Sequence, residues 1–262
     1  MLKKFLAFSR VSWALSMEYR SQAILWMMTS LLMIIMLVVW LGVSEQGVIN
    51  GFTRGDFVAY YMIGWVVRTM TAVWSSWEMD YHVRQGTLSP LLLRPIHPIW
   101  NEIAANLTEK IFRMAIVMPI VIAVLVSTPD ARVNLSLASL AAFVPAMIGA
   151  WLLVFLSDYL VGLLAFWTSQ TGAFIMGFYG LRVLLSGIVA PLAMFPTSVQ
   201  AILEWTPFPY MLNFPTAILT RSVSASELWF GFGVQAFWVA ALAAAVWGGW
   251  RAAMRSYSAV GA

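Results

Sequence analysis

Long stretches of the chain carry no charged residue, and this feature constrains its fold more than any other. One such stretch covers residues 23–43 and another covers residues 135–157. About 20 apolar residues cross a hydrocarbon core of roughly 30 Å. Hydrophobic residues make up 61% of the 262 residues and charged residues 10%, whereas a soluble domain is about half apolar and a quarter charged. The sequence therefore excludes an ordinary cytosolic enzyme, a disordered protein and a coiled coil, and predicts an all-α polytopic membrane protein.

Six segments qualify as transmembrane helices within a single membrane domain. They cover about residues 23–43, 57–77, 111–128, 135–157, 170–191 and 228–250. Hydropathy alone leaves one or two crossings between residues 159 and 203, where the only charged residue is Arg182. Lys and Arg gather near both ends of the chain, and cytoplasmic segments carry an excess of them. Both termini are therefore predicted to be cytoplasmic, with six crossings that place ten of the fifteen Lys and Arg inside, three outside and two within spans.

The first 22 residues precede the first span and carry four basic side chains. Read as a helix, this segment places Leu2, Leu6, Trp13 and Met17 near one side. The pattern predicts an interfacial helix that lies on the cytoplasmic membrane surface. Arg20 falls on the apolar side, so a simple basic anchor is the alternative.

The predicted cytoplasmic loop between spans two and three is unusually apolar. It reads Gly86-Thr-Leu-Ser-Pro-Leu-Leu-Leu-Arg-Pro95 and contains four leucines. Prolines remove backbone donors and restrict the residues before them. The pattern predicts a short helix that either dips into the bilayer surface or docks in a groove of another protein; a structural elbow is the alternative. The loop has no G-x-x-x-x-G-K-[ST] motif, so if transport here is driven by ATP, the ATPase must be a separate subunit.

The region after the fifth span is apolar but rich in proline. Five prolines fall within 25 residues: Pro191, Pro196, Pro207, Pro209 and Pro215. A straight crossing helix cannot contain them, and broken helices at membrane depth are tolerated when they pack within protein or line a cavity. The sequence predicts a pair of short helices that re-enter from the outside and gate the outer end of a pathway. A lipid-facing interfacial loop is the alternative.

Three ionisable residues lie in or beside the predicted spans. Arg68 and Arg182 are near the middle of spans two and five, and Asp158 is near the inner end of span four. A charge at the bilayer centre costs at least about 2.5–3.5 kcal/mol, so such residues usually face the interior and find partners. A buried pair of Asp158 with one arginine would fix helix packing; direct contact with substrate is the alternative.

Catalytic and metal-binding patterns are missing from the sequence. It contains no cysteine, no H-E-x-x-H and no G-x-S-x-G motif, and its two histidines are 15 residues apart. The net charge of +4 is explained by cytoplasmic loops rather than by nucleic acid. We therefore expect no catalytic residue, no metal and no nucleic-acid partner.

Several short motifs, in their order and spacing, resemble the membrane subunit of ABC-2 type transporters. The closest likeness is to the bacterial six-span branch that includes daunorubicin-resistance permeases. The likeness covers almost the whole chain. The motifs are Tyr60-Tyr61, the Gly86–Pro95 loop, Phe166-Trp167, Ser186-Gly187 with Pro191-Leu192, and Pro207-Phe208 with Pro215.

This resemblance implies a permease subunit in the plasma or inner membrane. The family has a cytoplasmic N-terminal connecting helix, re-entrant extracellular helices at about residues 191–224, and a coupling helix that fits a cleft on an ATPase. The coupling contact would comprise Gly86, Leu88, Leu91, Leu92, Leu93, Arg94 and Pro95. The complex would contain two permeases, identical or homologous, and two ATPases that bind ATP and Mg; this chain would hold no cofactor.

The leading hypothesis is therefore the permease subunit of an ATP-driven exporter. The alternative is a non-transporting membrane scaffold or immunity component with the same architecture. An ion-coupled secondary transporter is a weaker third reading, because such proteins use relays of intramembrane carboxylates and only Asp158 is available. Substrates as different as a drug, a lipid, a peptide and a glycan remain compatible with the sequence.

Overall fold

The computed structural model describes residues 31–257, and this part of the chain is all-helical, as predicted, with no β-strand. Its α-helices are α3 (Leu32–Val43), α4 (Arg54–Thr71), α5 (Ser75–Arg84), α6 (Leu88–Leu92), α7 (Ile99–Ser127), α8 (Leu137–Gly162), α9 (Thr171–Leu185), α10 (Thr197–Leu203), α11 (Asn213–Thr220) and α12 (Ala225–Ser256). Short 3-10 helices cover Ser44–Gln46, Leu163–Phe166, Leu192–Met194 and Phe208–Met211. The predicted interfacial helix and the start of the first predicted span lie outside the described residues.

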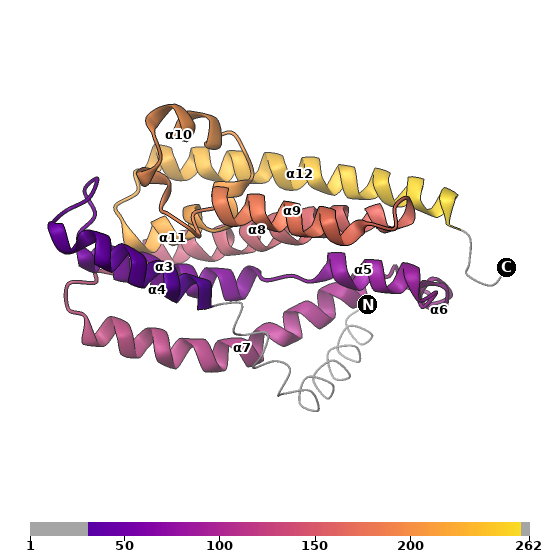
Figure 1. Cartoon of the computed structure of the whole chain (residues 1–262), viewed down its shortest axis with the longest axis horizontal. Coiled ribbons are helices and arrows are strands. Elements are labelled where there is room, and N and C mark those ends of the chain that lie inside the picture. The colour runs from indigo at the N-terminus through magenta and orange to yellow at the C-terminus, as the bar shows by residue number, and fades with distance from the viewer. Residues whose placement is uncertain (1–30, 258–262) are drawn as a thin grey trace.

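The long helices run along one common direction and form an elongated bundle (Figure 1). Among the described residues, three helical segments are long and apolar enough to cross a membrane: Ile99–Ser127, Leu137–Phe166 and Ala225–Ser256. α3 and α9 are shorter apolar helices. Many large apolar side chains are exposed on the surface, such as Val126 on α7 and Val38 on α3, as expected of a protein that is surrounded by lipid.

Two predicted spans are shorter in the structure than in the sequence pattern. The segment predicted at 57–77 is divided, because α4 ends at Thr71 and α5 begins at Ser75. The segment predicted at 170–191 ends at Leu185, where Ser186 closes α9 and Gly187 follows with φ +101°. Hydropathy depends on side chains only, so it does not predict the residue at which the backbone ceases to be helical.

α4 forms the centre of the bundle and packs against α3, α7, α8 and α11. Most of its side chains are buried, including Phe57, Tyr61 and Val67. Its start is set by a capping box, in which the Thr53 and Asp56 side chains each accept a hydrogen bond from the other residue's backbone N–H. Because α4 is buried on nearly every side, its side chains are held in the interior of the bundle.

The predicted inner and outer features lie at opposite ends of the bundle. α5 and α6 are at one end along the long axis, and α10 and α11 are at the other end, near the start of α12 (Figure 1). Between these ends, α4 and α9 carry the two predicted intramembrane arginines. The chain thus has three regions to consider as functional sites: the leucine-rich end, the proline-rich end and the interior between them.

Candidate functional site

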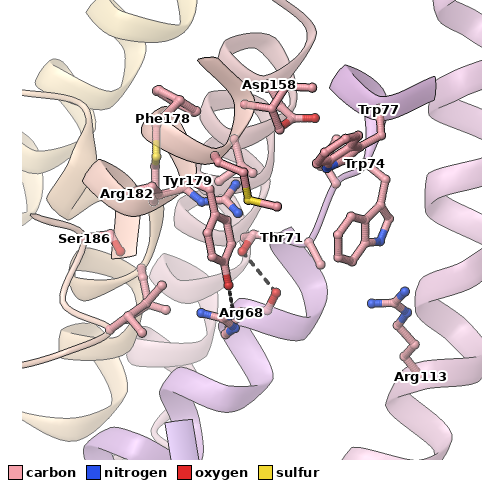
Figure 2. Close-up of a pocket in the computed structure, with 18 residues that line it drawn as sticks. Arg68, Thr71, Trp74, Trp77, Arg113, Asp158, Phe178, Tyr179, Arg182 and Ser186 are labelled. Carbon is pink, nitrogen blue, oxygen red and sulfur yellow. Dashed lines mark hydrogen bonds between the residues drawn. The ribbon is translucent and has the colours of Figure 1, made fainter. Parts of the chain in front are cut away.

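A cavity of about 440 Å³ lies in the interior, between α4, α5, α7, α8, α9 and the segments that follow α9. Its wall includes Arg68, Asp158 and Arg182, the three ionisable residues singled out in the sequence. Figure 2 shows these side chains approaching the cavity from three different helices. The cavity therefore brings together charged residues that are far apart in the sequence, with more than 100 positions between Arg68 and Arg182.

Tyr179 of α9 lies between the two arginines. Arg68 donates a hydrogen bond through Nη2 to the Tyr179 hydroxyl at 2.8 Å. The Arg182 guanidinium lies 5.3 Å from the centroid of the same aromatic ring, within the range of a cation–π contact. One aromatic side chain thus holds two cations on one wall of the cavity (Figure 2).

Asp158 has a different partner from the one that the sequence suggested. Its Oδ2 accepts a hydrogen bond from the Ser76 backbone N–H at 2.8 Å, and its Oδ1 accepts one from the Ser76 hydroxyl at 3.1 Å. No direct ion pair within residues 31–257 joins Asp158 to Arg68 or Arg182, although the opposite charges of Asp158 and Arg182 interact at longer range. Asp158 on α8 therefore caps the first turn of α5, where a negative charge also complements the helix dipole.

A third arginine that the sequence reading did not place here, Arg113 of α7, also lines the cavity. It lies near the start of the third predicted span, where a long basic side chain can reach the membrane surface, but in the structure it is buried. It pairs with Glu109 and lies 5.8 Å from the Trp74 ring centroid. The available signal was spacing, since Asn106, Lys110 and Arg113 recur every three to four positions and so share one helix face.

That polar face of α7 also holds the interruption between α4 and α5. The Ala72 carbonyl oxygen accepts hydrogen bonds from Asn106 Nδ2 at 2.9 Å and from Lys110 Nζ at 2.8 Å. Asn106 is oriented in turn, because its Oδ1 accepts a hydrogen bond from Trp151 Nε1 at 2.9 Å. A half-buried carbonyl at the end of α4 is thereby satisfied by side chains instead of by the next turn of a helix.

At the inner end, the leucine-rich loop forms the expected short helix, α6. Gly86 allows the chain to turn there, because its φ of +68° is a conformation that L-residues rarely adopt. Leu88 is fully buried, whereas Leu92 is 36% exposed and Leu93 is 87% exposed. Leu91 is half-buried, and Arg94 and Pro95 are exposed. The loop is thus anchored by one leucine and presents the others outward.

Hydrogen bonds fix this loop to its neighbours. The Ser89 and Tyr257 hydroxyl groups are 2.8 Å apart, which joins α6 to the end of α12. His82 Nδ1 lies 2.8 Å from the Thr87 hydroxyl oxygen. Burial lowers the pKa of His82 below its ordinary value, against the opposing effect of the Glu78 carboxylate. A largely neutral His82 can therefore serve as a hydrogen-bonding link between α5 and α6 at neutral pH.

The outer end is organised around the motif residues Tyr60 and Gly187. The Tyr60 hydroxyl donates toward the Gly187 carbonyl oxygen at 3.0 Å and Asn213 Oδ1 at 3.1 Å. Asn213 Oδ1 also accepts a hydrogen bond from the Leu192 N–H at 3.2 Å. The Tyr61 hydroxyl donates to the Val189 carbonyl oxygen at 2.9 Å. The irregular segment after α9 is thus attached to α4 by side-chain hydrogen bonds.

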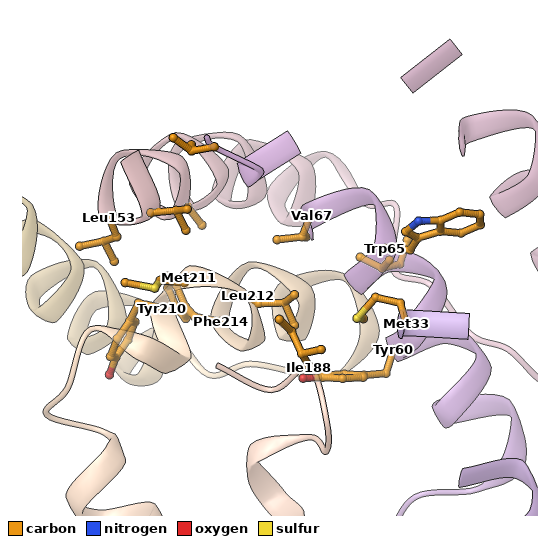
Figure 3. Packing of buried hydrophobic residues seen from close by; sticks show 14 of the residues in the cluster. Met33, Tyr60, Trp65, Val67, Leu153, Ile188, Tyr210, Met211, Leu212 and Phe214 are labelled. Atoms are coloured by element: carbon orange, nitrogen blue, oxygen red, sulfur yellow. The ribbon is translucent and has the colours of Figure 1, made fainter. Parts of the chain in front are cut away.

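Apolar packing completes this attachment. Figure 3 shows Ile188 and Leu212 lying with Tyr60 and Met33 in the buried cluster. The five prolines are distributed over the segment: Pro191, Pro209 and Pro215 are buried, Pro207 is half-buried and Pro196 is exposed. The predicted short helices are present as α10 and α11, and α11 is buried within the bundle.

No group of metal-binding side chains occurs in the described part of the chain.

Comparison with known proteins assigns the family. No curated protein and no solved structure matches the sequence. A family model described as "ABC-2 family transporter protein" matches residues 24–261. Because this match spans nearly the whole length, the chain belongs to the ABC-2 family of transporter proteins.

Proposed function

We propose that this chain is the permease subunit of an ATP-driven exporter of the six-span, daunorubicin-resistance-permease-like branch. Family membership makes it a membrane transport component that associates with ABC ATPases. In the proposed complex, two permeases form the translocation pathway and two ATPase subunits bind ATP and Mg. The chain crosses the cell membrane six times, with both termini in the cytoplasm, as its basic residues indicate.

The family match carries this proposal, and the form of α6 supports it. Leu88 is buried while Leu92 and Leu93 project from the end of the bundle. Exposed apolar side chains on an anchored helix are suited to a hydrophobic groove on a partner. We assign Gly86–Pro95 to the contact with the ATPase.

The helix α5 connects α6 to the cavity and can transmit motion between them. α5 begins at the Asp158 cap beside the cavity and ends just before Gly86 and α6. Its ten residues span about 15 Å at 1.5 Å per residue. Closure of the ATPase dimer on ATP binding would push α6, and α5 would transmit this displacement to the interrupted backbone at Ala72–Trp74. The proline-rich outer segment would act as the gate through which substrate leaves.

The coupling assignment is tested by placing charges on α6. Leu92→Asp with Leu93→Asp should abolish co-purification with the ATPase and substrate-stimulated ATP hydrolysis, because both carboxylates would be forced into an apolar groove. The control is Val48→Asp, at a residue that is 65% exposed between α3 and α4 and outside the predicted spans. The control should keep both activities.

The outcomes separate the competing functions. Co-purification that survives the α6 substitutions would show that this loop is not the ATPase contact. A wild-type chain that recruits no ATPase at all, although it reaches the membrane, would favour the scaffold. Transport that follows an ion gradient without ATP would favour a secondary transporter.

A further inference from the structure

The wall of the interior cavity has an excess of positive charge. Three arginines line it, at positions 68, 113 and 182, against the single carboxylate of Asp158. Both oxygens of that carboxylate already accept hydrogen bonds from Ser76. Arg113 is paired with Glu109, and the side chains of Arg68 and Arg182 line the same wall on either side of Tyr179.

Of Arg68 and Arg182, Arg182 gives the stronger indication of what the cavity binds. Its guanidinium contacts the Tyr179 ring and interacts electrostatically with Asp158, but within residues 31–257 its side chain forms no hydrogen bond and no direct ion pair. A guanidinium has five N–H donors in a fork that matches a carboxylate or phosphate group. An intramembrane cation is costly unless an anion or water compensates it. The fork of Arg182 is therefore suited to an acidic group.

Two further polar atoms at the cavity wall lack partners. The Ser186 hydroxyl belongs to a residue that is 1% exposed, and neither it nor Arg113 Nε has a hydrogen-bond partner among the described residues. Both residues line the cavity. Buried polar groups are almost always satisfied, so these atoms point independently to a polar ligand.

The remaining wall is apolar and aromatic. It includes Trp77, Ile175, Met176, Phe178 and Ile188. A cavity of about 440 Å³ falls in the range of ligand pockets, which combine a mostly apolar lining with a few placed polar groups. Such a wall would bury the apolar body of a ligand while the arginines bind its head.

We propose that this cavity binds an anionic amphiphile, meaning a molecule with an apolar body and one carboxylate or phosphate group held by Arg182 and Arg68. Resting on the proposed function, this inference names the substrate class: the exporter carries acidic amphiphiles and rejects cationic ones. Rejection follows from like charge, since a cation in this cavity would meet two arginines in a medium of low dielectric constant.

Direct binding tests the proposal without transport. Full-length protein in a neutral maltoside detergent is incubated with dodecyl phosphate or with dodecyltrimethylammonium, and bound probe is counted by native mass spectrometry. The two probes share a chain and differ in head charge. We expect dodecyl phosphate to bind at least about tenfold more tightly, as for a charge-assisted contact. Equal binding of both probes would overturn the proposal. Displacement by inorganic phosphate at equal concentration would overturn the amphiphile in favour of free phosphate.

Variants locate the binding to this cavity. Arg182→Gln should lower the affinity for dodecyl phosphate about tenfold or more, and Arg182→Lys, which keeps the charge, should retain more of it. The matched control is Arg251→Gln, because Arg251 also contacts an aromatic ring, 3.5 Å from the Trp247 centroid, but does not line the cavity. Wild-type affinity in Arg182→Gln would refute the site. Equal loss in the Gln and Lys variants would assign the effect to packing and refute it too.

The failure of this inference can be distinguished from failure of the proposed function. Probe binding is measured on the chain without its ATPase, and ATPase recruitment is measured through α6. Intact charge preference without any ATPase partner would refute the exporter and leave the binding site. Normal ATPase coupling without charge preference would refute the binding site alone.

Discussion

Two interruptions of the helical backbone, one on each side of the cavity, arise in different ways. The first covers Ala72–Trp74, between α4 and α5. The second follows α9 and contains Gly187, with φ +101°, and Pro191. The first contains neither glycine nor proline. The second is therefore encoded by its own residues, whereas the first depends on its neighbours.

Those neighbours are side chains of other helices. Asn106 and Lys110 of α7 hold the Ala72 carbonyl group, and Asp158 of α8 caps α5. An interruption encoded locally keeps its shape when the surrounding helices move. One that is made by tertiary partners can change when those partners shift. We therefore expect the outer segment to keep its shape and to move as a unit, whereas the inner interruption, at the end that carries α6, changes its shape with the helices that hold it.

The strongest test of this contrast is Asp158→Ala. It removes both acceptors from Ser76 and leaves a buried N–H unsatisfied. We expect a loss of about 3 kcal/mol in the free energy of unfolding, since hydrogen bonds to charged groups contribute about 1.5–3 kcal/mol each. Equilibrium unfolding by SDS in mixed micelles measures this loss.

The control for Asp158→Ala is Asp56→Ala. Asp56 belongs to an exposed capping box formed within four residues, so its loss should lower the free energy of unfolding by about 1 kcal/mol. A loss for Asp158→Ala no larger than that for Asp56→Ala would contradict the claim that Asp158 holds the inner interruption.

The outer interruption is tested by Gly187→Ala, with an expected loss of about 2 kcal/mol. A Cβ there would collide with the Tyr60 hydroxyl and lie 3.0 Å from Asn213 Cβ, in a backbone conformation that L-residues avoid. The matched control is Gly180→Ala on the preceding helix, where a Cβ meets open space. It should raise the free energy of unfolding slightly, because alanine favours helix over glycine. Unfolding in SDS measures the change in free energy for both variants. Equal changes in the two variants would rule out a special role for Gly187.

The sequence predicts those features that depend on local patterns. Helical content follows from the uncharged segments, the short helix α6 follows from its leucine-rich loop with prolines, and the irregular outer segment follows from its prolines. The placement of Arg68 and Arg182 toward the interior follows from the cost of exposing a cation to lipid. Each of these inferences needs only a residue and its immediate neighbours.

Features made by contacts between distant helices are not predictable from one sequence. Nothing near Ala72 signals that the helix stops there, since the groups that hold its carbonyl are 34 and 38 positions away. The same holds for Asp158, whose hydrogen-bond partner Ser76 is 82 positions away, while Arg182 interacts with its charge only at longer range. Charge complementarity suggests an Arg–Asp pair, but a helix terminus offers a carboxylate equally suitable donors.

The smallest expected effect tests whether the two donors to Ala72 act together. Asn106→Leu and Lys110→Met each leave one donor on the carbonyl oxygen, so each change should lower the free energy of unfolding by about 1 kcal/mol. The double variant removes both donors and leaves the half-buried carbonyl without a side-chain partner, so its loss should exceed the sum of the single losses by at least about 0.5 kcal/mol. A double-mutant cycle in SDS unfolding measures this coupling. Strict additivity would mean that another group satisfies the carbonyl, and the inner interruption would then not depend on α7.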